Sequence, residues 1–383
     1  MYLLQTLSRS LKVDLRHPAL FLFGAFLAAI PLHDACGQQP AEWRTDFRRH
    51  TVPLSEIVSG GPPKDGIPAL SRPRLESVAS ADRWLAPREP VMVVEHDGVA
   101  RGYPLQILIW HEIVNDNLGN LPIAVTFCPL CNTALVFDRR HNGRVLEFGT
   151  TGRLRHSDLV MYDKLTESWW QQATGEAIVG VMAGDALTLF ESQTMAWADF
   201  KRAYPAAQVL SRKTGYDRPY GTNPYKGYDA PGGSPLAAFF KSKTDARLPA
   251  MERVVALRLE REAVAYPFSR LRSARVINDM IARRPIAVFW APGTASALDR
   301  TDMASGRDVG ATGVFDRRLA NRTLTFESAQ GGGFRDRETG TRWDLLGNGL
   351  TGPLRGRRLV RIPYGDFFWF AWAVFRPDTR IGR

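Results

Sequence analysis

The chain has 383 residues, of which 44% are hydrophobic and 23% are charged. This composition excludes a wholly disordered chain, and the length predicts two or three domains, or two halves of one larger body. The net charge is +11, but the excess basic residues are scattered and form no dense run interleaved with aromatic residues. We therefore expect a solvated surface or peripheral attraction to anionic membranes, and no binding to nucleic acid.

The first 40 residues have the pattern of a targeting signal. Three basic residues precede an apolar stretch at 19–32, which is short for a membrane-spanning helix and typical of a signal-peptide core. Cleavage near Ala35, lipidation of Cys36 and retention as an anchor are the alternatives. Each predicts an extracytoplasmic protein, either periplasmic or membrane-anchored and facing the periplasm. Outside the cytoplasm two neighbouring thiols tend to form a disulfide unless a metal binds them or a reductant keeps them reduced.

Two parts of the chain are similar to each other. IVNDNLGNLPIAV at 113–125 aligns with VINDMIARRPIAV at 276–288, with six of thirteen positions identical. VFDRR at 136–140 then recurs letter for letter at 314–318. Such self-similarity predicts an internal duplication.

The predicted duplication organises the whole chain. We divide it into a signal or anchor at 1–40, an extension at 41–84, a first repeat at 85–210, a Gly/Pro/Tyr-rich linker at 211–247 and a second, degenerate repeat at 248–380.

The predicted elements of the first repeat alternate between strands and helices. Asp97-Gly98 predicts a hairpin turn, and the apolar spacing over 105–119 predicts a helix that ends at a glycine. Further strands are expected at 122–127, on both sides of a turn at 140–143, and at 157–163 and 177–182; a closing helix is expected at 195–205. The predicted fold is a β-rich α+β protein of two duplicated lobes.

Cys128 and Cys131 are two of only three cysteines in the chain. In the second repeat they align with Ala291 and Thr294, so we expect the same turn to form there without sulfur. A structural turn that contains small residues by chance accounts for the second repeat. In the first repeat, two thiols so close together indicate a pair with a chemical function.

Two histidines are candidates to assist the pair. His111 aligns with Ala274 and therefore belongs to the first repeat alone, whereas His156 has no clear counterpart. The alternatives are a core histidine for His111 and a solvated loop histidine for His156.

Two kinds of chemistry use such a pair. In a metal site, Cys128 and Cys131 with His111, His156 or a carboxylate such as Asp158 would suit copper, zinc or iron. In a redox couple, one thiol attacks a disulfide and the other resolves it, with an unidentified small molecule or protein as partner. A third alternative is a non-catalytic binding or scaffold module that contains an inert disulfide.

A second candidate site is an aromatic and polar cluster that would line a ligand groove or pack in a core. Its residues are Trp169, Trp170, Gln171, Thr174 and Glu176.

Several motifs together resemble a widespread prokaryotic family of unknown function that occurs on exported proteins. They include YPLQILIWHEIVND, VTFCPLCNTALVFDRR and SDLVMYDKLTESWWQQATGEAIVG, and the resemblance covers about residues 45–255. The family's Cys-Pro-x-Cys motif corresponds to Cys128 and Cys131, and its His-Glu motif to His111 and Glu112. His156 stands where the family pattern has Asn or another polar residue. The resemblance implies no particular reaction.

Overall fold

The structure is a computed structural model that describes residues 42–382. The targeting segment predicted at 1–40, with Cys36, lies outside the described residues. No helix within residues 42–382 is long and apolar enough to cross a membrane.

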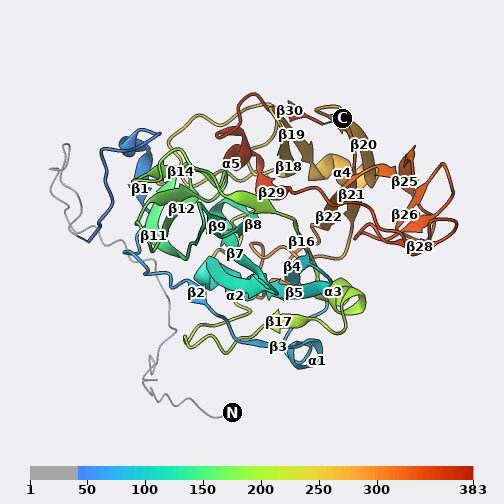
Figure 1. Cartoon of the computed structure of the whole chain (residues 1–383), viewed down its shortest axis with the longest axis horizontal. Helices are drawn as coiled ribbons and strands as arrows, with labels where there is room; N and C mark the ends of the chain where they lie inside the picture. Colours follow the sequence, from blue (N-terminus) through green and yellow to red (C-terminus); the bar gives the residue numbers. More distant parts are fainter. Residues whose placement is uncertain (1–41, 383) are drawn as a thin grey trace, which may run out of the picture. The chain divides into compact units, whose positions relative to one another are not determined.

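Strands dominate the described chain, and short helices connect them (Figure 1). This confirms the β-rich α+β class. The helices are α1 (Val78–Ala81), α2 (Leu105–His111), α3 (Trp197–Ala203), α4 (Phe268–Ala274) and α5 (Trp369–Ala373), with 3-10 turns η1 (Leu54–Glu56), η2 (Pro129–Cys131) and η3 (Met303–Ser305).

The part of the chain before residue 211 forms three five-stranded sheets. In spatial order the first contains β16 (Ser192–Ala196), β4 (Pro90–His96), β5 (Val99–Pro104), β17 (Gln208–Leu210) and β3 (Leu75–Ser77). The second contains β15 (Thr188–Phe190), β8 (Thr133–Asp138), β7 (Leu121–Cys128), β6 (Ile113–Leu118) and β2 (Leu70–Ser71). The third contains β1 (Ile57–Ser59), β11 (Phe148–Arg155), β12 (Asp158–Asp163), β13 (Trp169–Gln171) and β14 (Ala177–Val179).

The part after residue 252 has a similar order of elements in smaller sheets, without a strand that corresponds to β15. One sheet contains β29 (Gly365–Phe368), β18 (Arg253–Leu259), β19 (Glu262–Pro267) and β30 (Arg380–Ile381). The next contains β20 (Val276–Ile281), β21 (Arg284–Ala291) and β22 (Ala311–Asp316), and the last contains β25 (Phe326–Ser328), β26 (Phe334–Asp336), β27 (Arg342–Trp343) and β28 (Gly349–Thr351). Two separate hairpins are β9 (Arg140–His141) with β10 (Arg144–Val145) and β23 (Arg318–Leu319) with β24 (Arg322–Thr323).

The helix predicted over 105–119 is wrong in its second half. Helix α2 ends at His111, and β6 follows as one arm of a hairpin with β7. Glu112 breaks the helix because it adopts a φ of 58°, outside the helical region. Five of the six residues of β6 are buried, so both faces of the strand carry buried side chains. The sequence therefore lacks the alternation of apolar and polar residues that indicates a half-exposed strand.

Other local predictions agree with the structure. β4 and β5 pair as a hairpin in which His96 lies opposite Val99, so Asp97-Gly98 form a two-residue turn, with φ values of 47° and 78°. Helix α3 stops before Pro205, and residues 211–247 contain no helix or named strand.

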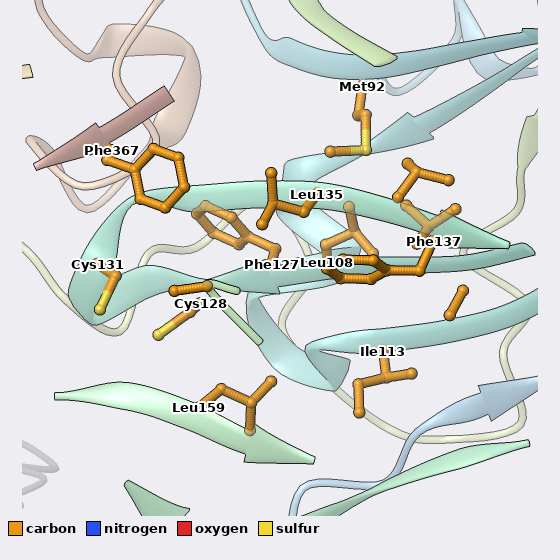
Figure 2. Close-up of a cluster of buried hydrophobic side chains, with 14 of the residues drawn as sticks. Met92, Leu108, Ile113, Phe127, Cys128, Cys131, Leu135, Phe137, Leu159 and Phe367 are labelled. Carbon is orange, nitrogen blue, oxygen red and sulfur yellow. The ribbon is translucent and has the colours of Figure 1, made fainter. Parts of the chain in front are cut away.

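The largest hydrophobic core draws side chains from both sides of the linker. Phe127 and Leu135 lie close to Phe367 of β29, as Figure 2 shows, and strand β29 packs against β8. From Trp43 onward the chain forms one compact unit. Each half therefore buries part of its apolar surface against the other.

Candidate functional site

Cys128 and Cys131 lie on one tight turn between β7 and β8. Strand β7 ends at Cys128, and the 3-10 turn η2 spans Pro129–Cys131, where proline fits because the first position of a helical turn needs no N–H donor. Asn132 takes the left-handed conformation, with φ 51° and ψ 36°, and returns the chain into β8. Because side chains three positions apart in a 3-10 turn nearly eclipse each other, the two thiols project to the same side.

The third member of the site comes from β12, which begins at Asp158. Figure 2 shows both sulfur atoms pointing away from β7 and β8, toward the side on which Leu159 of β12 lies. The two sulfur atoms and one carboxylate oxygen of Asp158 all lie within 4.8 Å of one another. The Cys128 Sγ also lies 3.7 Å from the backbone oxygen of Ser157.

The Asp158 carboxylate is fixed at one oxygen only. Its Oδ2 accepts hydrogen bonds from Gln171 Nε2 at 2.6 Å and from the backbone N–H of Ala173 at 2.9 Å. Its Oδ1 is buried and has no nitrogen or oxygen donor within residues 42–382, so the thiols of Cys128 and Cys131 are the polar groups beside it. A buried oxygen that faces two thiols without a donor of its own is placed to ligate a cation.

Burial controls the ionisation of the site. It raises the pKa of Asp158 to about 7 and, with repulsion from Asp158, raises the pKa of the nearby Glu112 to about 8. Burial also raises the pKa of the Cys128 thiol, and that of Cys131 well above its ordinary value. No lysine or arginine of the described chain contributes strongly to the pKa of any of these four groups. Their anionic forms therefore lack a compensating charge, which a metal cation would supply.

The linker at 211–247 covers the cysteine turn. Tyr228 Oη donates a hydrogen bond to the Leu130 carbonyl at 3.0 Å, and the Phe239 carbonyl accepts one from the Ser157 N–H at 3.0 Å. The linker thus closes the site from water, and the exposed fractions of Cys128, Cys131 and Asp158 are at most 1%.

The second half of the chain also supports the turn. Arg253 Nη1 donates a hydrogen bond to Asn132 Oδ1 at 2.6 Å, and Arg253 Nη2 forms an ion pair with Asp229 of the linker at 2.6 Å. Asn132 immediately follows Cys131, so this contact fixes the end of the turn.

His111 lies at the end of α2, outside the Cys128/Cys131/Asp158 group. Its Nδ1 lies 2.7 Å from the Pro68 carbonyl oxygen, and its Nε2 lies 2.6 Å from Tyr220 Oη. Burial lowers the pKa of His111, which favours a neutral ring that donates to Pro68 and accepts from Tyr220. Both ring nitrogens are therefore engaged, and the structure does not bring His111 to the thiols as a ligand.

His156 is two residues from Asp158 but has different neighbours. Its Nδ1 lies 3.1 Å from Ser242 Oγ, and its Nε2 lies 3.3 Å from the carboxylate of Glu56. The structure places this imidazole outside the group of three as well.

The predicted aromatic and polar cluster is divided among several environments. Trp169 packs in a small hydrophobic cluster, and Trp170 Nε1 donates to the buried carboxylate of Asp163 at 3.0 Å. Gln171 holds Asp158, as described above. Thr174 and Glu176 instead line a cavity between the two halves of the chain. The five residues therefore do not line one groove.

Glu112 is a residue beside the site that the sequence indicated only as part of the family's His-Glu motif. It is buried, and its charge influences the pKa of Cys128. The available signal was a carboxylate directly after His111, within an otherwise apolar run of the predicted helix.

Comparison with known proteins gives one match. The sequence model of a family described as "protein of unknown function (DUF3179)" matches residues 64–379. The match begins later than the expected resemblance at 45–255 and extends through the second half of the chain. No curated protein and no solved structure matches the chain.

Proposed function

The chain belongs to the DUF3179 family of proteins of unknown function, and we propose that it binds a transition-metal ion through Cys128, Cys131 and Asp158. The observation that carries this proposal is the convergence of two thiols and one carboxylate oxygen within 4.8 Å in a buried site. Asp158 Oδ1 supports it, because this buried oxygen lacks a nitrogen or oxygen donor.

The donor set favours zinc over copper and iron. Two thiolates suit soft ions, whereas a carboxylate suits harder ones, and Zn²⁺ accepts both kinds of donor in tetrahedral sites. Three protein ligands leave one position of a tetrahedron open, as in catalytic zinc sites. Glu112 is a buried acid whose charge influences Cys128, and it would accept a proton from a water molecule bound at that position.

We further propose that the protein works outside the cytoplasm and that its two halves arose by duplication. The basic and apolar pattern of residues 1–40 supports export, and the aligned segments support duplication. The second half lacks a comparable group of three ligands among the described residues, and its role is to complete the core and hold the turn through Arg253.

Thiol redox chemistry is the second candidate, since Cys128 and Cys131 are free thiols on one turn beside a carboxyl group that can take a proton. Burial of both sulfurs and the raised pKa of both thiols act against it, because an attacking thiolate must be ionised and accessible.

Metal analysis of the full-length protein tests the proposal. Protein purified under reducing conditions should take up about one Zn²⁺ per chain, and a competing chromophoric chelator should report its affinity. Cys128→Ser and Asp158→Asn should each weaken zinc binding by more than about 100-fold, beyond the 10- to 100-fold effect of losing an outer-shell partner. Ala291→Ser in the second half is the matched control and should leave the affinity unchanged.

The same samples distinguish the alternatives. Thiol titration of the denatured, metal-free protein in a Cys36→Ser background should find two free thiols, and zinc should protect both thiols of the folded protein when partial denaturation exposes those of the metal-free form. A chain that takes up no zinc, copper or iron while both thiols are reduced would rule out the metal site. A Cys128–Cys131 disulfide that resists reduction would support the inert scaffold.

A further inference from the structure

A cavity of about 360 Å³ lies at the seam between the two halves of the chain. Its walls come from β8, from the segment after β13, from β18 and β29, and from α5 with the residues that follow it. This volume falls within the range of small-molecule sites, about 300–1,000 Å³.

Most of the residues that line the cavity are apolar. Phe137 and Leu135 of β8 line it from the first half, and Phe367, Trp372 and Ala256 line it from the second half. These walls would remove apolar surface of a ligand from water, which is the main source of affinity for such a molecule.

The charged side chains that line the cavity leave one positive charge uncompensated. Glu176 and Arg376 form an ion pair at 3.1 Å and neutralise each other. Arg258 also lines the cavity and is exposed, and no hydrogen bond or ion pair of its side chain is found within residues 42–382. An arginine without a partner beside an apolar cavity fits a carboxylate or a similar anion.

We propose that this cavity binds an amphiphilic anion, an apolar chain or ring that carries one carboxylate, with the apolar part inside and the carboxylate on Arg258. The cavity is separate from the candidate metal site, although Ala173 belongs to both: it lines the cavity, and its backbone N–H donates a hydrogen bond to Asp158. The proposal does not depend on metal binding.

Isothermal titration calorimetry with three ten-carbon ligands tests the proposal on the full-length protein. Decanoate, decanamide and decylamine share the apolar chain and differ in charge, and each is used below the concentration at which it forms micelles. We expect decanoate to bind with a stoichiometry of one, more tightly than decanamide, and decylamine to bind most weakly. Equal affinity for all three, or no binding of decanoate at millimolar concentration, would overturn the proposal.

Three variants locate the bound ligand. Arg258→Glu should weaken decanoate binding about three- to tenfold, as expected when an exposed ion pair is replaced by repulsion. Arg261→Glu makes the same charge change on an exposed arginine that does not line the cavity and should have no effect. Ala186→Trp places an indole at the exposed rim of the cavity and should block binding of decanoate and decanamide alike.

Binding that survives Ala186→Trp, or that Arg261→Glu weakens as much as Arg258→Glu, would show that the ligand lies elsewhere. Cys128→Ser should retain decanoate binding, so a failure of the metal proposal leaves this test intact.

Discussion

The strand ends at Cys128 and at Ala291 have the same local framework. Glu112 and Arg275 follow short helices, have φ values of 58° and 65°, and accept a hydrogen bond from the opposite strand at 2.8 and 2.9 Å. Only the first strand end continues into a turn with two thiols. The framework up to Ala291 forms without sulfur, but the expectation that the same turn follows it is wrong: residues 292–294 form no 3-10 turn and lead into a long connection to β22.

The two halves also differ in the hairpin that faces this turn. In the first half, β11 and β12 pair over six residue positions and extend to Asp158. In the second half, β25 and β26 pair over three positions and end at Ser328. The longer hairpin supplies the carboxylate. Among the described residues, the first half therefore contains a ligand set that the second lacks, because its cysteine turn and its β11–β12 hairpin have no equivalent of the same length or shape in the second half.

The largest expected effect comes from separating the halves. Residues 248–383 expressed alone should fail to fold cooperatively, since Phe367 and its neighbours belong to a core that includes Phe127 and Leu135 of the first half. Thermal melts followed by circular dichroism check this, with the full-length chain as control. A soluble fragment with a sharp melting transition would contradict it.

The pH dependence of stability tests the buried acids of the first half. Asp158 and Glu112 have raised pKa values, about 7 and about 8, so the folded protein retains protons that the unfolded chain loses near pH 4. Their stabilising effect is full below that pH and is lost as the pH rises through 7 and 8. The free energy of unfolding of the metal-free protein should therefore fall by about 3 kcal/mol per carboxyl between pH 5 and pH 8.

Urea unfolding at several pH values measures this change. Asp158→Asn should remove its share of the pH dependence, whereas Glu260→Gln on an exposed turn should not. Saturating zinc should reverse the trend, because metal binding requires the deprotonated ligands. A flat profile for the metal-free protein would mean that these acids are not protonated in the folded state.

Moving the thiols to the second half tests whether thiols alone make the site. The double change Ala291→Cys and Thr294→Cys, in a chain that carries Cys128→Ser and Cys131→Ser, should bind zinc at least about 100-fold more weakly than the native protein, because no 3-10 turn brings these positions together and no carboxylate corresponds to Asp158 there. Competition with a chelator measures the affinity. Native-like binding by this variant would show that Asp158 is dispensable.

Several parts of the fold were predictable because their signals are local. The turn at Asp97-Gly98, the strand before Cys128 and the stop of α3 before Pro205 each depend on neighbouring residues. The end of α2 was not predictable from apolar spacing, since the residues of β6 are buried on both faces. In the site, the sequence drew attention to Cys128 and Cys131 but could not select Asp158 over the histidines.

The sequence by itself determined the β-rich class, the linker without regular elements and the proximity of Cys128 to Cys131, because each rests on residues close together in the chain. Only the tertiary structure decided which third ligand joins them. The β11–β12 hairpin delivers Asp158 to the two thiols, while Pro68 and Tyr220 hold His111 in other contacts. The apolar cavity also exists only in the folded chain, since Leu135 and Phe367 line it from opposite sides of the linker. Contacts of this kind depend on how distant segments pack, which no local pattern encodes.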